Sequence, residues 1–257
     1  MKIRKKSTKF PFLILILAGL GILFYKDSYL SQTPSPSPES SVVSLPLADA
    51  GEIPSWYTSL PPFSGTPWVS VNEGTPFFTE EELTTEAFEH YQELDELGRC
   101  GVAYANVCPD TMPAEPRGEI GMIRPSGWHT VKYDCIKDLY LYNRGHLIGY
   151  QLTGENANQR NLFTCTRYLN VDGMLPWESQ VARYVRDTGN HVLYRVTPCY
   201  DGENLVASGV RMEAYSVEDS GAGVCFNVYC YNVQPGIVID YTTGESHIDA
   251  ELSAPGF

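Results

Sequence analysis

Three absences limit the folds and functions that this sequence allows. No two of the seven cysteines form a CxxC pair, which argues against a zinc ribbon. No internal repeat is visible, so the sequence does not indicate a repeat protein. Basic residues are scarce, with 18 Lys and Arg against 31 Asp and Glu. The resulting net charge of −13 opposes binding to a polyanion unless positive charge is concentrated locally.

The N-terminus has the composition of a membrane-targeting segment. A basic cluster precedes an uncharged run from Phe10 to Tyr25, an order typical of a secretory signal or a signal anchor. The run is just shorter than the roughly 17–25 residues of a membrane-spanning helix. Neither a small-x-small cleavage site nor a lipid-accepting cysteine follows it directly. We therefore expect residues 1–26 to form a single-pass anchor in the cell membrane, with the rest of the chain outside. A cleaved signal and a secreted protein are the alternative.

A linker and one folded domain are expected after this segment. Ser31 to Ser44 is rich in Ser and Pro and has little apolar bulk, so residues 27–50 are predicted to be a semi-extended linker. Residues 51–257 have a globular composition and are long enough for one sizeable core. All seven cysteines lie in this domain, where the expected location permits disulfides. Burial as small apolar side chains explains the cysteines equally well.

Charge is unevenly distributed within the expected domain. Residues 51–257 hold 12 basic and 28 acidic residues, a net charge of −16. Ten of the basic residues but only seven of the acidic ones lie between Arg117 and Arg195, which leaves that region at +3 and the remainder at −19. A local positive region, aided by a divalent metal ion, can concentrate a polyanion on an otherwise acidic protein.

Hydrophobic patterns predict an α+β fold with a mainly antiparallel sheet. Two segments have apolar residues at helical spacing, the second ending at Gly189 with Pro176 in its first turn. A β-hairpin is predicted before the second helix, followed by interruptions at Gly145 and Gly149, and strands are predicted after the helix. The expected helices are 80–97 and 168–186, the hairpin strands are 130–135 and 139–143, and the later strands are 191–197, 205–215 and 224–233.

Residues 143–146 combine groups suited to general-base hydrolysis. His146 follows Gly145 at the end of the predicted hairpin, where it can project into an open groove. Its neutral imidazole can take a proton from water near neutral pH, and Arg144 offers a bidentate partner for a phosphate or a leaving oxygen. A single histidine is more often an ordinary surface or core residue, so this pattern is informative only in combination with others.

Two residues in the second predicted helix are candidates for a metal site. Asn170 and Glu178 are eight residues apart, a little over two helical turns, so an unbroken helix places them on roughly one side. An amide oxygen and a carboxylate are hard ligands of the kind that Mg²⁺ accepts, directly or through retained waters. Alternatively, Asn170 caps the helix and Glu178 lies on a solvated face.

Together these motifs resemble the DNA/RNA non-specific endonuclease family, a group of His-Me or ββα-metal finger nucleases. NRGH at 143–146 is followed by an Asn-rich segment and by the Asn…Glu pair. The segments GMIRPSGWHTVKYD, LYNRGHLIGYQLTGENANQRNLFTCTRYLNVDGMLPWE and FNVYCYNVQPGIVIDYTTGE are similar to the Gram-positive branch that includes DNA-entry nucleases. The resemblance covers roughly residues 95–245 and is strongest from Ile120 to Glu178.

The resemblance implies a hairpin-then-helix active site that hydrolyses phosphodiester bonds of DNA and RNA without sequence preference. His146 would be the general base, and Asn170 the protein ligand of a single Mg²⁺, with Mn²⁺ as the other option. Glu178 would hold a water of that ion, Arg144 would steady the phosphate or leaving group, and Asn161 would help to position the histidine or the water. The basic residues expected to bind substrate are Arg124, Lys132, Arg160 and Arg167.

Departures from the family pattern leave alternatives open. The family motif begins with Asp where this chain has Asn143, a change expected to alter the rate or the pH optimum. Relatives carry an upstream Arg next to a Trp, whereas Trp128 has no adjacent Arg, so Arg124, Arg117 or Lys132 must replace it. A nuclease specific for RNA, and a catalytically impaired surface protein that binds nucleic acid or an envelope partner, are the alternatives. No obligate protein partner is indicated.

Overall fold

The computed structural model describes residues 54–250 of the chain. The anchor expected over residues 1–26 and the linker expected over residues 27–50 lie outside the described residues. Within the described part, no helix is both long enough and apolar enough to cross a membrane.

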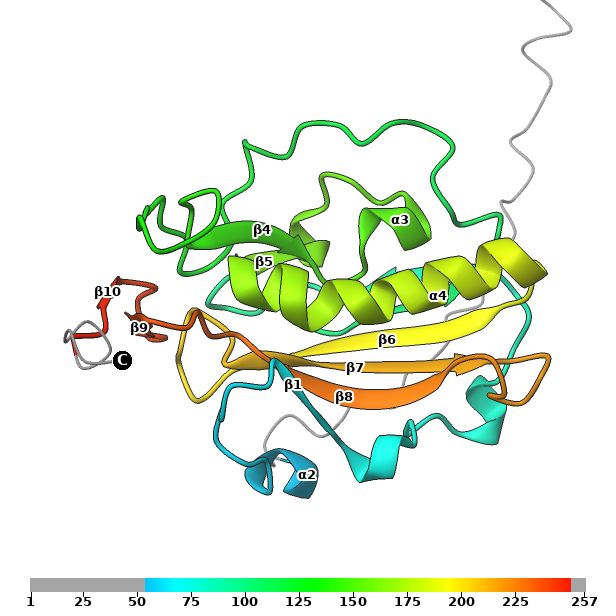
Figure 1. Ribbon diagram of the computed structural model, residues 1–257. Helices are drawn as coiled ribbons and strands as arrows, with labels where there is room; N and C mark the ends of the chain where they lie inside the picture. Colours follow the sequence, from blue (N-terminus) through cyan, green and yellow to red (C-terminus); the bar gives the residue numbers. More distant parts are fainter. Residues whose placement is uncertain (1–53, 251–257) are drawn as a thin grey trace, which may run out of the picture. The chain divides into compact units, whose positions relative to one another are not determined.

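A six-stranded antiparallel sheet forms the centre of the fold (Figure 1). The strand order is β1-β8-β7-β6-β3-β2, so neighbouring strands come from both ends of the described chain. The strands are β1 (Trp68–Ser70), β2 (Phe88–Tyr91), β3 (Ala103–Val107), β6 (Val192–Cys199), β7 (Gly209–Ser216) and β8 (Cys225–Tyr231). The mainly antiparallel α+β fold and its three C-terminal strands are confirmed.

A second, two-stranded sheet lies above the large one and differs from the predicted hairpin. It consists of β4 (Tyr142–His146) and β5 (Leu162–Thr166), joined through α3 (Tyr150–Thr153) and η3 (Gln159–Asn161). The segments 130–135 and 139–143, predicted as the hairpin, share only one bridge, between Lys132 and Tyr140. The sequence pattern failed here because the true partner of β4 lies across an intervening connection rather than a tight turn.

Gly145 lies within β4 instead of interrupting the chain. A Cβ at this position would lie 2.5 Å from Cβ of Cys165 and 3.1 Å from Cε1 of Phe163, both on β5. Glycine is therefore required for close packing of the two strands, not for a turn. The strand continues to His146, which is consequently fixed at the end of a paired segment.

The helix α4 (Leu175–Thr188) covers one face of the large sheet (Figure 1). Val181, Ala182 and Val185 of this helix are fully buried in the core. Pro176 occupies the first turn, and the helix ends at Gly189 in the left-handed conformation, with φ +74°. Both helix signals predicted from the sequence are confirmed.

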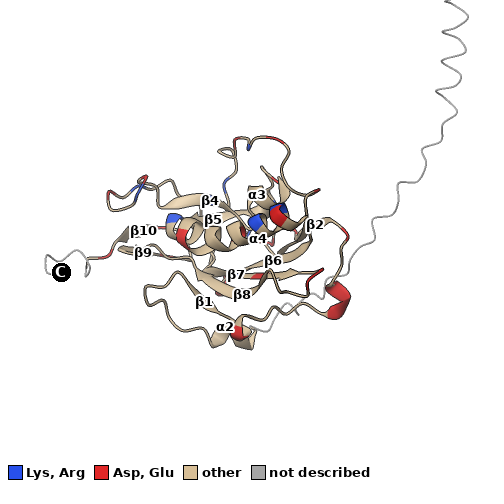
Figure 2. Ribbon diagram, turned by 45° about the vertical axis from the view of Figure 1, so that its right-hand side comes forward, with Lys and Arg blue, Asp and Glu red and all other residues tan. Residues whose placement is uncertain are grey.

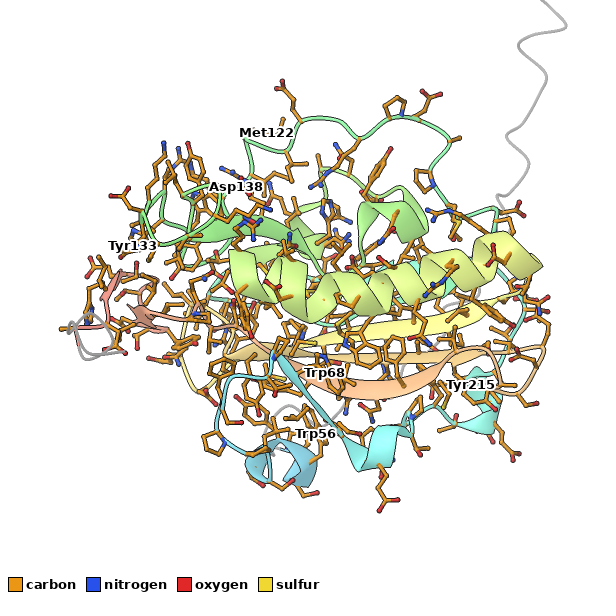
Figure 3. The ribbon with its side chains drawn as sticks, viewed as in Figure 1. Trp56, Trp68, Met122, Tyr133, Asp138 and Tyr215 are labelled. Carbon is orange, nitrogen blue, oxygen red and sulfur yellow. The ribbon has the colours of Figure 1, made fainter. Side chains whose placement is uncertain are left out.

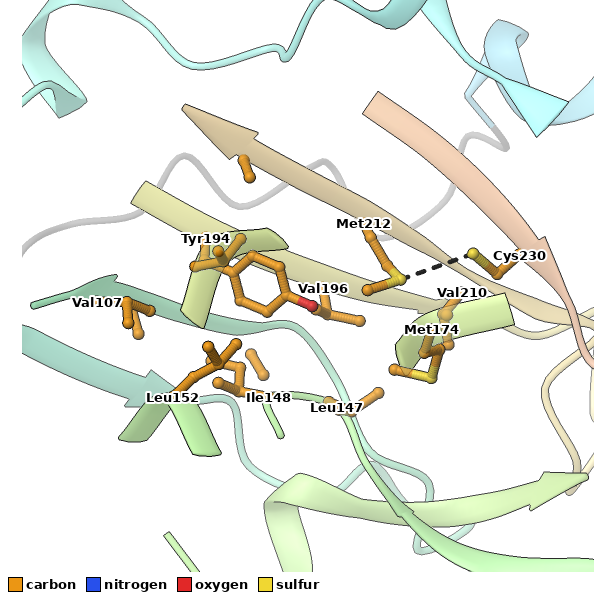
Figure 4. Close-up of a cluster of buried hydrophobic side chains, with 14 of the residues drawn as sticks. Val107, Leu147, Ile148, Leu152, Met174, Tyr194, Val196, Val210, Met212 and Cys230 are labelled. Carbon is orange, nitrogen blue, oxygen red and sulfur yellow. Dashed lines mark hydrogen bonds between the residues drawn. The ribbon is translucent and has the colours of Figure 1, made fainter. Parts of the chain in front are cut away.

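The core under α4 also holds the residues that directly follow His146. Leu147 and Ile148 are fully buried and lie in one apolar cluster with Val107 and Tyr194 (Figure 4). Removing such side chains from a packed core costs about 2–5 kcal/mol each. The end of β4 is therefore anchored by packing on the side away from the solvent.

The other face of the large sheet is covered by residues 54–84. Along β8, Phe226, Val228 and Cys230 belong to the core under α4, whereas Tyr229 and Tyr231 face the N-terminal segment, as expected for the two-residue period of a strand. The N-terminal segment contains α2 (Ser55–Thr58) and the 3-10 turns η1 (Asn72–Gly74) and η2 (Glu80–Glu82). A small hairpin, β9 (Ile237–Ile239) and β10 (Ser246–Ile248), lies near the end of the described chain.

The helix predicted over residues 80–97 is not formed. Residues 80–82 make a single 3-10 turn, capped by reciprocal hydrogen bonds between Thr79 and Glu82. Phe88–Tyr91 instead form β2, which pairs with β3, and the Phe88 ring packs edge-on against Tyr104 at 4.9 Å. Helical preferences amount to less than about 1 kcal/mol per residue, so pairing with an open strand edge outweighs them.

All seven cysteines are unpaired, and five of them are buried. The buried ones are Cys100, Cys108, Cys165, Cys199 and Cys230. Of the two sequence-based alternatives, the five buried cysteines fit apolar packing groups, whereas Cys135 and Cys225 are exposed.

Candidate active site

A cleft of about 730 Å³ lies between the small sheet, α3 and the start of α4. It brings together residues that are far apart in the sequence, including four of those proposed to act in catalysis. The lining residues are Arg117, Ile120, Trp128, Thr130, Tyr140, Tyr142, Asn143, Arg144, His146, Gly149, Tyr150, Gln151, Asn170, Leu175 and Glu178. The alternative in which Asn170 and Glu178 have separate, purely local roles does not fit this convergence.

The hydrogen bonds of His146 define which ring nitrogen is available as a base. Nε2 lies 2.8 Å from the carbonyl oxygen of Asn156. A carbonyl can only accept, so Nε2 carries the proton and Nδ1 is the acceptor nitrogen of the ring. Nδ1 accepts a long hydrogen bond of 3.4 Å from Arg117 Nη2, and Arg117 also lines the cleft. The neutral tautomer is thus oriented with its acceptor nitrogen on the cleft side.

The environment keeps His146 neutral. Burial lowers the pKa of His146 to about 4, and the charge of Arg117 acts in the same direction, while the bond to the Asn156 carbonyl opposes it. An imidazole with this pKa is unprotonated throughout the neutral range and can accept a proton there. It is a base that needs no prior deprotonation.

Asn161 fixes the chain immediately after His146 but does not reach the cleft. Its side chain is fully buried, accepts from the Ile148 N–H at 2.9 Å and donates to the Ile148 carbonyl at 3.0 Å. Its own carbonyl accepts from the Leu147 N–H at 2.8 Å. Of the two roles implied for Asn161, this geometry is suited to positioning the histidine and not to holding a water.

A π turn sets the angle between Asn170 and Glu178. In η4 (Leu169–Met174), the Leu175 N–H bonds to the Asn170 carbonyl five residues earlier. In a regular α-helix, residues eight positions apart are offset by about 80° around the axis. A π turn takes up more residues per turn, which reduces this offset. The helix is continuous, as expected, but its first part is not α-helical.

Glu178 is a buried carboxyl group without a full set of positive partners. Burial raises the pKa of Glu178 to about 7, although hydrogen bonds from the Gln151 side chain, the charge of Arg117 and the Gly149 N–H oppose this rise. A Cβ on Gly149 would lie 2.7 Å from Glu178 Oε2, so only glycine lets the backbone approach the carboxylate. Gln151 was not identified from the sequence because it carries no motif signal of its own.

The oxygen donors of the cleft fit a divalent cation. Asn170 and Glu178 supply an amide and a carboxylate oxygen to the same cleft, and the raised pKa of Glu178 marks a carboxylate that a nearby cation would stabilise. No cluster of three or more His, Cys, Asp or Glu side chains suited to a metal occurs among residues 54–250. Two oxygen donors fit an ion that keeps most of its waters.

Arg144 is held in the cleft wall by backbone and aromatic contacts. Its Nε donates to the Ile123 carbonyl and its Nη2 to the Gly121 carbonyl at 2.9 Å, while its guanidinium lies 4.1 Å from the centre of the Trp128 ring. Burial and the nearby charge of Arg124 lower the pKa of Arg144. The guanidinium is fixed in position and retains N–H groups for an anion.

The other basic residues predicted to bind substrate are placed differently. Arg124 lies near Arg144, as its effect on the pKa of Arg144 shows, and Lys132 lies against Tyr140, a residue of the cleft. Arg160 instead pairs with Glu93 at 2.9 Å, and Arg167 pairs with Asp138 at 3.0 Å. Neither Arg160 nor Arg167 lines the cleft.

Arg117 is the upstream basic residue that the structure brings to His146. The sequence placed it among three candidates but could not select it, because residues 114–119 have no regular structure that would fix its direction. Figure 2 shows Lys and Arg on the loops near β4 and on α4, interspersed with Asp and Glu, whereas the turn η2 is entirely acidic.

Comparisons with known proteins give one family and one fold. A family model described as DNA/RNA non-specific endonuclease matches residues 79–218. NucA from Streptococcus agalactiae with a magnesium ion bound is similar in structure, with 27% identity and a TM-score of 0.62 over 70% of this chain and 86% of that chain. NucA without metal gives a TM-score of 0.63 at 27% identity, over 73% and 90% of the two chains.

The Sda1 nuclease with a bound zinc ion shares the fold at 24% identity and a TM-score of 0.58, over 70% of this chain and 95% of that chain. The family match spans more than half of the 257 residues. The matched range, residues 79–218, contains β4, β5 and α4 and all the residues that line the cleft.

Proposed function

The chain belongs to the DNA/RNA non-specific endonuclease family, and from this membership we propose that it cleaves both DNA and RNA with His146 as the general base. The family resemblance inferred from the sequence is thereby confirmed, and with it the hydrolysis of nucleic acid. The roles of individual residues, the identity of the metal ion and the cellular location are our proposals.

The orientation of His146 is the observation that carries the assignment. Its Nε2–H is bound to the Asn156 carbonyl, so Nδ1 is the nitrogen that can accept a proton, from a water that replaces the long hydrogen bond of Arg117. The imidazolium that results keeps the same hydrogen bond, which becomes stronger when the ring is charged. Arg117 stands 3.4 Å from Nδ1, so a phosphate oxygen that engages Arg117 lies next to the attacking water.

The remaining cleft residues support binding and charge stabilisation. Arg144, fixed by Gly121, Ile123 and Trp128, offers preorganised donors to the phosphate or leaving oxygen. Asn170 would hold a divalent cation, and Glu178 would accept a hydrogen bond from a water of its hydration shell. Such an ion offsets the negative charge that builds up on the phosphate during hydrolysis.

Mg²⁺ is the proposed ion, with Mn²⁺ as the other option. Two hard oxygen donors favour Mg²⁺, and one NucA structure contains it, while the Sda1 structure contains zinc. Contacts to phosphate and to one ion do not distinguish bases or sugars, which supports activity on both polymers. Extracellular action from a membrane anchor is supported by the composition of residues 1–26.

The test is metal-dependent cleavage by the full chain, kept in mild detergent because of its apolar N-terminal run. Supercoiled plasmid and RNA are incubated separately with Mg²⁺, Mn²⁺, Zn²⁺ or EDTA, beside a His146→Ala variant. We expect loss of both polymers with Mg²⁺ or Mn²⁺ only, and only with the unmodified chain. Cleavage of RNA alone would establish the RNA-specific alternative, and a folded chain that binds but never cleaves would establish the binding protein.

A further inference from the structure

An exposed aromatic ring at the rim of the cleft is not used by the proposed hydrolysis. Tyr140 is 44% exposed and lines the same cleft as His146, Asn170 and Glu178. Large aromatic side chains elsewhere in the fold pair with one another, as Tyr104 does with Phe78 and Phe88. Among residues 54–250, no aromatic ring pairs with that of Tyr140. The ring is therefore partly exposed in the cleft and has no aromatic partner.

Lys132 places a positive charge over one face of this ring, so a base would stack on the opposite face. Its Nζ lies 4.5 Å from the centre of the Tyr140 ring, and the two residues are joined by an isolated β-bridge. A cation next to an exposed aromatic ring is the combination by which proteins hold single-stranded nucleic acid, with bases on the ring and phosphates on the cation. In duplex DNA the faces of the bases are covered by their neighbours and cannot reach such a ring.

The turn before Tyr140 is strained and yet firmly held. Asp138 and Leu139 both have positive φ, 68° and 71°, although neither is glycine. Non-glycine residues rarely adopt this conformation, and such strain is concentrated at functional positions. Leu139 is also 41% exposed, so its conformation is not explained by burial of its side chain.

Arg167 holds this turn in place. Its Nε and Nη2 donate to Asp138 Oδ2 at 3.1 and 3.0 Å (Figure 3 shows Asp138 beside β4), and its backbone N–H bonds to the Leu141 carbonyl at 2.8 Å. Arg167, expected to bind substrate, is thus placed to position the turn. A ring held in place before binding loses little conformational freedom when a ligand stacks on it.

We propose that Tyr140 is a stacking platform for an unpaired nucleobase next to the scissile phosphate, and that Lys132 binds the adjoining phosphate. The preferred substrate is then single-stranded DNA or RNA, or an unpaired region of a duplex. This inference rests on the proposed nuclease function for its consequence in cleavage, but the binding of a base to Tyr140 is testable without cleavage.

The binding experiment uses the full chain with His146→Ala, in Mg²⁺, so that the nucleic acid stays intact. Fluorescence anisotropy measures the affinity for a labelled oligothymidylate and for an abasic oligonucleotide of the same length. The base-dependent preference should be about tenfold, should vanish in Tyr140→Ala and should persist in Tyr140→Phe. Lys132→Gln should weaken both ligands equally and reduce the salt dependence.

A second experiment measures cleavage by the chain with His146 intact. Tyr140→Ala should lower kcat/KM on single-stranded oligonucleotides by about tenfold, with a smaller loss on the matching duplex. The control variant is Leu97→Ala, which shortens an exposed apolar side chain outside the cleft. It should leave kcat/KM unchanged on both the single strand and the duplex. Thermal unfolding of every variant shows whether the fold is retained, and the exposure of Tyr140 makes retention the expected result.

The outcomes separate this inference from the proposed function. If the unmodified chain cleaves and Tyr140→Ala keeps both its base preference and its single-strand activity, the stacking platform is refuted and the nuclease stands. If the unmodified chain cleaves nothing while Tyr140 still governs base-dependent binding, the nuclease is refuted and the platform stands. Loss of the preference in Tyr140→Phe would also refute stacking, because the ring is retained.

Discussion

Two buried carboxylates on opposite sides of the large sheet are surrounded very differently. Glu213, on β7, is fully buried and faces the N-terminal segment. It pairs with Arg195 at 2.9 Å and Arg211 at 2.9 Å and accepts the Phe77 N–H at 2.8 Å. Glu178, on α4, is 8% exposed and has Gln151, Gly149 and the more distant charge of Arg117 around it.

The two arrangements differ in whether the charge is already neutralised. The arginines beside Glu213 are also covered by aromatic rings, Arg211 by Trp56 at 4.6 Å and Arg195 by Phe78 at 4.6 Å. Both arginines are ion-paired with Glu213, although Arg211 Nε has no hydrogen-bond partner among residues 54–250, and the cluster joins the N-terminal segment to the sheet. Glu178, whose pKa is raised to about 7, has only the more distant charge of Arg117 to offset its own. An incompletely neutralised buried charge in a cleft indicates a functional site, whereas a neutralised one indicates structure.

The largest expected effect is on the rate after His146→Ala. We expect kcat to fall by about 10³–10⁴-fold, the contribution of a general base, with little change in melting temperature because the packing of Leu147 and Ile148 is untouched. Plasmid nicking in Mg²⁺ and a thermal melt of the same preparation measure both. A folded variant with substantial activity would remove His146 from the mechanism.

Matched Glu→Gln substitutions test the comparison directly. Glu213→Gln leaves two buried guanidinium groups short of a partner, so the free energy of unfolding should fall by about 3–5 kcal/mol. Glu178→Gln removes a costly buried charge, so stability should be unchanged or higher, while affinity for Mg²⁺ falls about 10–100-fold. Urea denaturation and metal titration measure the two quantities. Equal destabilisation by both changes would show that the two carboxylates play the same structural role.

In EDTA, the ionisation of His146 and that of Glu178 should make the free energy of unfolding depend on pH in opposite directions. The pKa of His146 is lowered from 6.5 to about 4 in the folded chain, so its contribution is complete above pH 6.5 and is lost as the pH falls towards 4. The pKa of Glu178 is raised from 4.5 to about 7, so its contribution is complete below pH 4.5 and is lost as the pH rises towards 7. Each of these pKa shifts changes the free energy of unfolding by about 3 kcal/mol across its pH range.

The contributions of His146 and Glu178 to the pH dependence of stability nearly cancel in the unmodified chain. A substitution that removes one of the two groups should therefore make the other measurable. Between pH 4.5 and 6.5, the stability of Glu178→Gln should rise more steeply with pH than that of the unmodified chain, and the stability of His146→Ala should fall relative to it. Denaturant melts at several pH values provide the slopes. Parallel curves for all three proteins would mean that neither group is perturbed by folding.

The smallest effect is expected from restoring the family residue with Asn143→Asp. The Asn143 side chain lines the cleft but makes no hydrogen bond to residues 54–250, so no contact is lost. A partly exposed carboxylate near Arg144 is worth about 1 kcal/mol or less, which limits the change in kcat/KM to about tenfold. A gain of several hundredfold in plasmid cleavage would show instead that the natural Asn143 impairs catalysis.

The sequence by itself determined the family, the basic region and the helix that carries Asn170 and Glu178. These depend on local signals: the NRGH motif, the spacing of the Asn…Glu pair, Pro176 at the start of the helix and Gly189 at its end. Local signals persist in the fold because they concern residues within a few positions of one another. The three C-terminal strands were predicted for the same reason.

The tertiary structure alone decided which residues meet. Residues 80–97 became a turn and an edge strand because β3 offered an unpaired edge, and β4 found its partner across fifteen intervening residues, 147–161. The position of Arg117 beside His146, the hydrogen bond that fixes the tautomer of His146 and the burial of Glu178 all depend on contacts between distant segments. Long-range pairing and burial are properties of the packed chain, so no local pattern in the sequence records them.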